Sequence, residues 1–254
     1  MSIVLNEVKQ AEYIIKKGEV GKKPTSTLFL LGKYYRTKKN FTKEQTVVEL
    51  NNFMKKNYKN YNPALWEQTI EDISNKANKY NLREINSIGI CKSEIDEIRK
   101  IHNLKYERLL FALLCYAKLY NTISENNNGW VNTDIPELYR VARVTVKYRN
   151  DKFLFLNDLE KTGLISFSNK NENLNLKVNF CNMDEEAILI IDDFRELGYE
   201  YLNYIKLGKF IRCSECNRLI KKTNNKLLYC NECKISVHHK QKYEWDLKNR
   251  KSEK

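Results

Sequence analysis

Two pairs of cysteines near the end of the chain have the spacing of a metal site. Cys213 and Cys216 form one C-x-x-C pair, Cys230 and Cys233 form the second, and 13 residues separate the pairs. Each pair can offer two sulfurs to a single ion, and four thiolates suit tetrahedral zinc, with iron as the main competitor. Four protein ligands leave no position open for water, so we predict one structural Zn²⁺.

A disulfide and a redox site are the alternatives for these cysteines. Disulfides are uncommon in a reducing cytosol, and a redox C-x-x-C pair does not need a second copy at this spacing. The intervening segment NRLIKKTNNKLLY predicts a β-hairpin with its turn at Asn224 and Asn225. His238 and His239 follow the last cysteine, but the ligand set is already complete, so we expect them beside the site or in solvent.

The stretch RCSECNRLIKKTNNKLLYCNECK resembles the C-terminal zinc-ribbon tails of phage and integrative-element proteins of low-GC Gram-positive bacteria. In such tails a basic helix commonly follows the second cysteine pair, and KISVHHKQKYEWDLKNRKSEK fits that place here. The resemblance implies a protein of a phage or mobile genetic element, with a zinc ribbon or treble-clef-like module, in the cytoplasm of a bacterial host cell.

Upstream of the cysteines, the order of predicted elements is that of a winged helix-turn-helix. Residues 106–121 form the most apolar predicted helix, WVNTDI a short strand and PELYRVARV a second helix. A third helix is predicted over 145–163, with Phe153, Leu156 and Leu159 on its buried face. LISFS and NLKVNF then form a hairpin. Over residues 104–181 this pattern resembles the winged-helix DNA-binding domains of phage and plasmid proteins.

That resemblance implies that the third helix enters the major groove of duplex DNA, where its exposed side chains contact bases and phosphates. The candidate DNA contacts on this helix and the adjoining wing are Lys147, Arg149, Asn150, Lys152, Lys170 and Lys177. Winged helices also serve as protein-docking modules, so the fold alone does not decide the partner. Asp151 and Asp158 lie on the same helix and would repel phosphate if they faced it.

The formal charge of +13 at pH 7 is unevenly spread along the chain. Residues 183–205 carry 1 basic and 7 acidic side chains, whereas residues 206–254 carry 14 basic and 5 acidic ones. The basic tail predicts sequence-independent contacts with DNA phosphates, although codon bias of an AT-rich genome would also raise the lysine content. These tail candidates are Arg218, Lys221, Lys222, Lys240, Lys242, Lys248 and Arg250. The acidic stretch, residues 183–200, favours docking to a host protein complex.

We expect a mainly α protein with small β elements (α+β). Its predicted parts are a helical domain over 1–100, a winged-helix-like domain over 101–182, an acidic connecting segment over 183–208 and a four-cysteine zinc ribbon with its basic C-terminal helix over 209–254. In the first part, Thr42 and Gln45 fit a capping box. Pro63 opens a helix with one predicted apolar side, formed by Leu65, Ile70, Ile73 and Ala77. The remaining cysteines, expected in the core, are Cys91, Cys115 and Cys181.

Several function classes lack support in the sequence. No apolar run is long enough to cross a bilayer and the chain begins without a signal-peptide pattern, so we expect a cytoplasmic protein without membrane partners. The motifs H-E-x-x-H, G-x-S-x-G and the Walker loop do not occur, and we expect no enzyme. The acidic residues 184–186 and 192–193 flank the apolar run AILII and could hold nuclease metal ions, but a solvated turn or a docking surface explains them more simply.

Two functions from different classes therefore remain in competition. The first is a DNA-binding protein of a phage or mobile element that acts in transcriptional control or replication. The second is a phage-encoded inhibitor that binds a host protein complex for defence or nucleic-acid processing, using its acidic segment and basic tail. The salt dependence of binding to random duplex DNA would separate the two.

Overall fold

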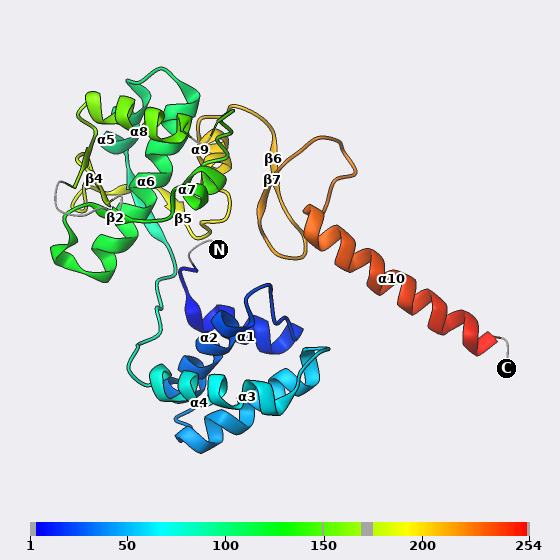
Figure 1. The fold of residues 1–254 in the computed structure, drawn as a ribbon. Helices are drawn as coiled ribbons and strands as arrows, with labels where there is room; N and C mark the ends of the chain where they lie inside the picture. The colour runs from blue at the N-terminus through cyan, green and yellow to red at the C-terminus, as the bar shows by residue number, and fades with distance from the viewer. Residues whose placement is uncertain (1–3, 149, 169–174, 253–254) are drawn as a thin grey trace. The chain divides into compact units, whose positions relative to one another are not determined.

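The structure is a computed structural model that describes residues 4–148, 150–168 and 175–252 (Figure 1). The chain is mainly helical with small antiparallel sheets, as predicted. It divides into two compact units, one over residues 4–86 and the other from Ser87 onward. Within the described residues, no helix is both long and apolar enough to span a membrane.

The first unit is built from four helices, namely α1 (Glu7–Lys17), α2 (Pro24–Thr37), α3 (Lys43–Asn57) and α4 (Pro63–Ala77). The predicted capping box at the start of α3 is confirmed: the Gln45 N–H donates to the Thr42 hydroxyl and the Thr42 N–H donates to the Gln45 side chain. Side chains from all four helices form its core, including Ile14, Leu28, Leu50 and Ile70.

The apolar side predicted for α4 is correct except at its first member. Ile70, Ile73 and Ala77 are buried, but Leu65 is 78% exposed. Leu65 precedes Ile70 by five positions, which turns it away from the buried side of a helix with 3.6 residues per turn. Trp66, four positions before Ile70, packs against the core instead and meets the ring of Tyr58 edge-on.

The second unit is organised around one central helix, α6. Its elements in chain order are β1 (Ile88–Cys91), α5 (Lys92–Arg99), α6 (Leu104–Ile123), the 3₁₀ turn η1 (Glu125–Asn127), β2 (Trp130–Asn132), α7 (Ile135–Val141), α8 (Asp151–Lys161), β3 (Ile165–Phe167), β4 (Asn175–Val178), β5 (Ala187–Ile191), α9 (Leu197–Tyr204), β6 (Phe210–Arg212), β7 (Leu219–Lys221) and α10 (Asn231–Ser252). Every side chain of α6 from Leu109 to Leu119 is buried. A helix that is apolar on nearly all sides must be covered by other elements on nearly all sides, and this holds for α6.

The elements from α6 to β4 follow the predicted order of helix, strand, two helices and a two-stranded hairpin. β3 and β4 pair antiparallel, so that the predicted hairpin is confirmed, and β2 joins the other edge of β4. The result is a three-stranded sheet in the order β2-β4-β3. Val131, Ile165, Leu176 and Val178 are its buried side chains.

The helix predicted over 145–163 is shorter in the structure, where α8 spans Asp151–Lys161. Val144, Thr145 and Val146 are β-branched and disfavour a helix, and the Asp151 carboxylate accepts from the Tyr148 N–H to form a turn before α8 begins. Leu156 and Leu159 are buried as predicted, but Phe153 is 44% exposed.

The inward position expected for Phe153 is taken by a neighbouring aromatic residue. Phe155 packs its ring edge-on against Tyr106 of α6, with 5.0 Å between the ring centroids. The sequence FLFL offers two phenylalanines two positions apart, and these cannot both face the core of a helix.

The expected acidic connecting segment over 183–208 is instead part of the core of the second unit. β5 pairs antiparallel with β1, and Phe194, Leu197 and Tyr201 are fully buried. The rings of Phe194 and Tyr201 pack on Tyr116 and Phe111 of α6. Because β5 pairs with β1, residues 87–100 also belong to this unit, whereas the sequence placed them in the helical domain over 1–100.

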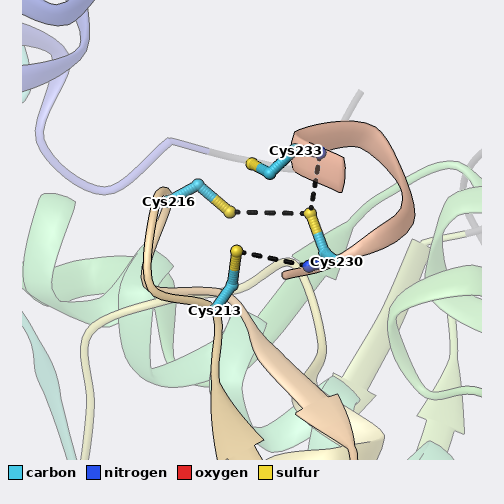
Figure 2. Close-up of side chains that lie close together, drawn as sticks. All are labelled: Cys213, Cys216, Cys230 and Cys233. Atoms are coloured by element: carbon cyan, nitrogen blue, oxygen red, sulfur yellow. Dashed lines mark hydrogen bonds between the residues drawn. The ribbon is translucent and has the colours of Figure 1, made fainter. Parts of the chain in front are cut away.

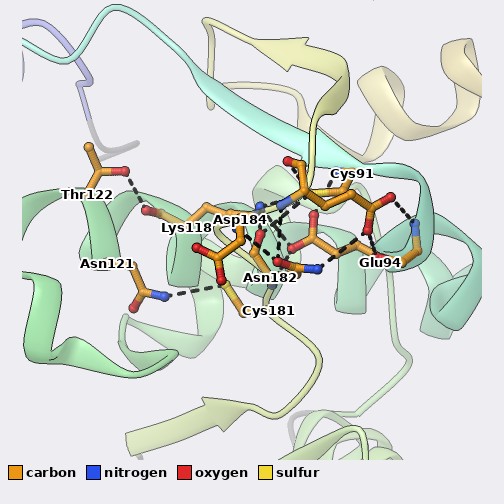
Figure 3. Close-up of polar contacts among 10 residues, drawn as sticks. Cys91, Glu94, Lys118, Asn121, Thr122, Cys181, Asn182 and Asp184 are labelled. Carbon is orange, nitrogen blue, oxygen red and sulfur yellow. Dashed lines mark hydrogen bonds and ion pairs between the residues drawn. The ribbon is translucent and has the colours of Figure 1, made fainter.

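A buried ion pair lies where β1, α5 and α6 meet (Figure 3). The ammonium of Lys118 is 3.0 Å from Glu94 Oε1 and 3.4 Å from the sulfur of Cys91, and it donates to the carbonyl of Asn182. Glu94 also accepts from the N–H groups of Cys91 and Asn182. Burial lowers the pKa of Lys118, but the hydrogen bond and charge of Glu94 outweigh it and raise that pKa, so Lys118 is charged.

The three cysteines outside the C-x-x-C pairs lie in or beside this core, as expected. Cys91 and Cys115 are buried, and Cys181 is half-buried. Burial raises the pKa of all three thiols, which keeps them protonated and unreactive at neutral pH.

Candidate metal centre

The four cysteines of the C-x-x-C pairs converge in the structure (Figure 2). Cys213 and Cys216 lie in the turn that joins β6 to β7, and Cys230 and Cys233 lie at the beginning of α10. All four sulfur atoms lie within 4.8 Å of one another. This is the separation expected of four ligands around one ion, so the side chains can hold a metal ion together.

The turn that carries the first pair is set by its backbone. The N–H of Cys213 donates to the carbonyl of Arg218, and the N–H of Asn217 donates back to the carbonyl of Cys213. Asn217 has a φ of 58°, in the left-handed region that asparagine adopts more easily than most residues. The chain therefore reverses directly after Cys216, and both sulfurs point to the same side.

Backbone N–H groups point at the sulfur atoms (Figure 2). The N–H of Cys230 lies 3.3 Å from the sulfur of Cys213, and the N–H of Cys233 lies 3.4 Å from the sulfur of Cys230. Burial raises the pKa of the Cys213 thiol, but N–H groups of Cys230, Cys216 and Glu215 outweigh it and lower that pKa to about 6. Donors to sulfur stabilise the thiolate, which is the form that binds metal.

The thiol of Cys233 has the opposite tendency. Burial and the neighbouring sulfurs of Cys216 and Cys230 raise its pKa, because both disfavour a negative charge on the sulfur of Cys233. A divalent cation among the four sulfurs reverses this repulsion. Four thiolates in this arrangement therefore need a cation among them, whereas without one the raised pKa favours the protonated thiol of Cys233.

Few side chains other than the cysteines support this site. Among the side chains described between residues 206 and 246, only Cys213, Leu219 and Cys230 are buried. Arg195, which the sequence analysis missed, donates from Nη2 to the carbonyl of Cys216 at 2.8 Å and pairs with Asp193. The signal that could have identified Arg195 is weak: it is the one basic residue in an acidic stretch.

The prediction of a hairpin between the two cysteine pairs is wrong, because the hairpin lies earlier in the chain. β7 pairs with β6, which precedes Cys213, so the hairpin encloses the first C-x-x-C pair. Asn224 accepts from the N–H of Lys226, as in a turn, but no strand follows it before Cys230. The turn that carries Cys213 and Cys216 itself reverses the chain, and residues 222–229 form no strand.

The predicted DNA contacts around α8 are partly accessible. Lys147 and Asn150 are exposed just before the helix. Lys152 is half-buried, with its ammonium 5.5 Å from the ring centroid of Tyr139, and Lys177 is half-buried on β4. The remaining two, Arg149 and Lys170, lie outside the described residues.

The predicted phosphate contacts of the tail fall on residues 209–233, which we call the four-cysteine module, and on the rest of α10. Arg218 forms an ion pair with Glu232 at 3.0 Å, and Lys222 is half-buried. The exposed ones are Lys221, Lys240 and Lys242, and the side chains of Lys248 and Arg250 lie outside the described part of the chain. His238 and His239 are exposed on α10.

The acidic residues around β5 are not gathered into a metal site. Glu185 accepts from the N–H and the hydroxyl of Ser93 at the start of α5, which lowers its pKa, and Asp193 pairs with Arg195. In the described part of the chain, the four cysteines are the one group of at least three His, Cys, Asp or Glu residues placed to share an ion.

Comparison of the chain with protein-family models, with curated proteins and with solved structures gave no match. The geometry itself supplies the functional evidence. It consists of four cysteines close enough to share an ion, a helix-and-sheet arrangement with Lys147 and Asn150 exposed before α8, and a terminal helix with exposed Lys240 and Lys242.

Proposed function

We propose that this protein binds duplex DNA for a phage or mobile element, in transcriptional control or replication. The observation that carries the proposal is the sheet order β2-β4-β3 after α6, α7 and α8. In a winged helix-turn-helix the strand after the first helix pairs with the last strand, and the third helix is presented to the major groove. This correspondence supports α8 as the recognition helix.

The surface at the start of α8 suits contact with DNA. Lys147, Tyr148 and Asn150 are exposed there, and an exposed Asn amide can pair with the adenine edge. The two acidic side chains of α8 that could repel phosphate, Asp151 and Asp158, both accept hydrogen bonds within the protein. Asp158 binds Lys161 and the Tyr106 hydroxyl, each at 3.0 Å, and Asp151 accepts from the Tyr148 N–H.

Zinc is the ion that best fits the four-cysteine centre. Four sulfur ligands in a closed set favour Zn²⁺, whose role is then structural. One pair on a hairpin turn and one at the start of a helix supports a treble-clef-like module. The module would hold Lys221 and the basic α10 in place for sequence-independent contacts with phosphates.

The test is the affinity of Asn150→Ala for a selected duplex site and for random duplex DNA. We expect a loss of about 1–3 kcal/mol on the selected site only, because a base contact carries sequence information. Asn157→Ala is the matched control, since Asn157 is exposed farther along the same helix and should have little effect. Equal losses on both DNAs, or an equal loss from the control, would reject α8 as the recognition helix.

One observation favours the second candidate, a protein-binding inhibitor of a host complex. The exposed side of α8 carries apolar side chains, with Leu154 58% and Phe153 44% exposed beside Tyr148 at 60%. Contiguous exposed apolar groups often mark protein interfaces. A chain that binds no duplex at low salt, yet co-purifies with a host complex and loses it on Leu154→Ser, would favour this candidate.

A further inference from the structure

A cavity of about 510 Å³ lies within the second unit, away from the four sulfurs. Its walls come from α6, from α7 and the turn after it, from α9, and from β6 and β7. Sites for small molecules commonly enclose about 300–1,000 Å³. The cavity is therefore large enough for a nucleotide-sized ligand.

Four cations line this cavity and no carboxylate does. Two of these cations form ion pairs with acidic side chains that do not line the cavity. Arg140 pairs with Glu137 at 2.7 Å, and Arg143 pairs with Glu196, whose side chain is buried. Arg108 and Lys221 have no ion-pair partner among the residues that the structure describes. The cavity thus presents unbalanced positive charge.

Two hydrogen bonds hold the Arg108 guanidinium in place and leave some of its N–H groups available to a ligand. Its Nε donates to the carbonyl of Leu104 at 3.0 Å, and its Nη1 donates to the carbonyl of Arg143 at 2.8 Å. Burial lowers the pKa of this guanidinium, so its charge is poorly solvated. Its Nη2 group makes no hydrogen bond within the described chain. An oriented guanidinium with free N–H groups is suited to a phosphate oxygen.

Aromatic rings form the wall beside the cations. The ring centroids of Tyr199 and Phe210 are 5.2 Å apart, and the guanidinium carbon of Arg143 lies 5.0 Å from the Tyr199 centroid. Rings next to cations can contact the base or sugar of a nucleotide while the cations bind its phosphate.

Two backbone features form this cavity before any ligand arrives. Arg143 follows the C-cap of α7 with a φ of 54°, a left-handed position where glycine is usual, and its carbonyl accepts from Arg108. Gly198 allows α9 to lie directly on this turn, because a Cβ there would collide with the carbonyl oxygen of Ala142. A site fixed in advance loses less entropy when it binds.

We propose that this cavity binds a phosphate ester, with Arg108 and Lys221 as the contacting cations and Tyr199 and Phe210 against the attached nucleoside. A free nucleotide and a nucleotide unit of a DNA strand share this chemistry. For the DNA strand the inference rests on the proposed function, whereas for the free nucleotide it does not.

The experiment measures binding of ADP, of inorganic phosphate and of a random duplex to the full-length, metal-loaded protein by calorimetry. Lys221→Glu is the main variant, because Lys221 is exposed on β7 and its side chain holds no other element. We expect it to weaken ligand binding about tenfold or more, the scale of one charge-assisted contact. Arg108→Gln should have a similar effect, provided that its thermal unfolding matches that of the unmodified chain.

Lys226→Glu is the matched control, since Lys226 is an exposed lysine of the same module that does not line the cavity. Loss of ADP binding in Lys221→Glu but not in Lys226→Glu would identify a free nucleotide as the ligand, even if no duplex is bound. Loss of duplex binding alone in both Lys221→Glu and Arg108→Gln, but not in Lys226→Glu, would identify the strand. Equal effects of the two variants on every probe, or no binding of any probe, would overturn the proposal.

Discussion

Helix α6 and the four-cysteine module belong to one compact unit, yet different interactions stabilise them. Every side chain of α6 from Leu109 to Leu119 is buried, with aromatic rings of α9 and the segment before it packed on the helix. The module has three buried residues among its described side chains, and two of these are cysteines of the metal site. Apolar burial therefore stabilises the region around α6, whereas we expect the module to draw its stability from a metal ion held by the four cysteines.

The largest expected effect is the loss of the module when the metal is removed. Structural zinc contributes about 10–16 kcal/mol in small zinc-binding peptides, far more than three buried side chains can. A chelator, or Cys230→Ser, should expose the amides of residues 209–230 to hydrogen exchange while those of α6 stay protected. Elemental analysis should find one zinc per chain, and an iron centre would instead be visible by its absorption.

Cys181→Ser is the control for this prediction, because Cys181 is a half-buried cysteine outside the module and should leave the metal content unchanged. If the amides of residues 209–230 stay protected from hydrogen exchange in metal-free protein, the module does not depend on a metal ion for its stability. Disulfides at Cys213, Cys216, Cys230 or Cys233 in protein prepared from the cytosol would contradict the metal site too.

The next largest effect concerns the charged pair inside the core. Lys118→Met leaves Glu94 buried without its partner, and this should lower the free energy of unfolding by about 3–5 kcal/mol in urea titrations. Adding Glu94→Leu should recover part of the loss, because apolar replacements of a buried pair are often tolerated. Lys92→Met removes an exposed pair with Asp96 and should cost about 0–1 kcal/mol. If Lys118→Met and Lys92→Met lower the free energy of unfolding by similar amounts, the Lys118–Glu94 pair is not buried in solution.

A smaller effect links the core to the module through Glu200 of α9, which pairs with Arg212 of β6 at 2.9 Å. Burial raises the pKa of Glu200 to about 7, and Asp193 and Asp192 add to this, although Arg212 opposes it. A raised pKa in the folded state means that the linked stability is complete below the unfolded pKa of 4.5 and is lost as the pH rises through about 7.

Glu200→Gln should therefore match the unmodified chain near pH 4.5 and be more stable by about 1–3 kcal/mol at pH 8. Thermal or urea unfolding of both proteins across this range measures the difference. Stability curves that stay parallel from pH 4.5 to pH 8 would show that Glu200 is not desolvated in the folded state.

Local patterns predicted much of this structure. The cysteine spacing identified the four side chains that lie close enough together to hold an ion, Thr42 and Gln45 identified a helix start, and the order of elements from α6 to β4 agrees with the sequence. Each of these depends on residues near one another in the chain.

The features that could not be predicted depend on contacts between distant residues. Ile90 pairs with Leu189 about a hundred positions later, and no local signal shows that such short strands meet. The cavity gathers Arg108, Arg143 and Lys221 from separate elements. Where the sequence offered two similar side chains, as with Phe153 and Phe155, packing against Tyr106 decided which one turns inward.

DNA binding is tested most directly by the affinity of the zinc-loaded protein for random duplex DNA as salt is raised from about 50 to about 200 mM. The proposal predicts clear binding at the lower salt, with a logarithm of affinity that falls linearly with the logarithm of salt. Lys240→Gln with Lys242→Gln should reduce that slope by about one unit for each phosphate that the protein no longer neutralises. No binding at about 50 mM salt, or a slope near zero, would contradict the proposal.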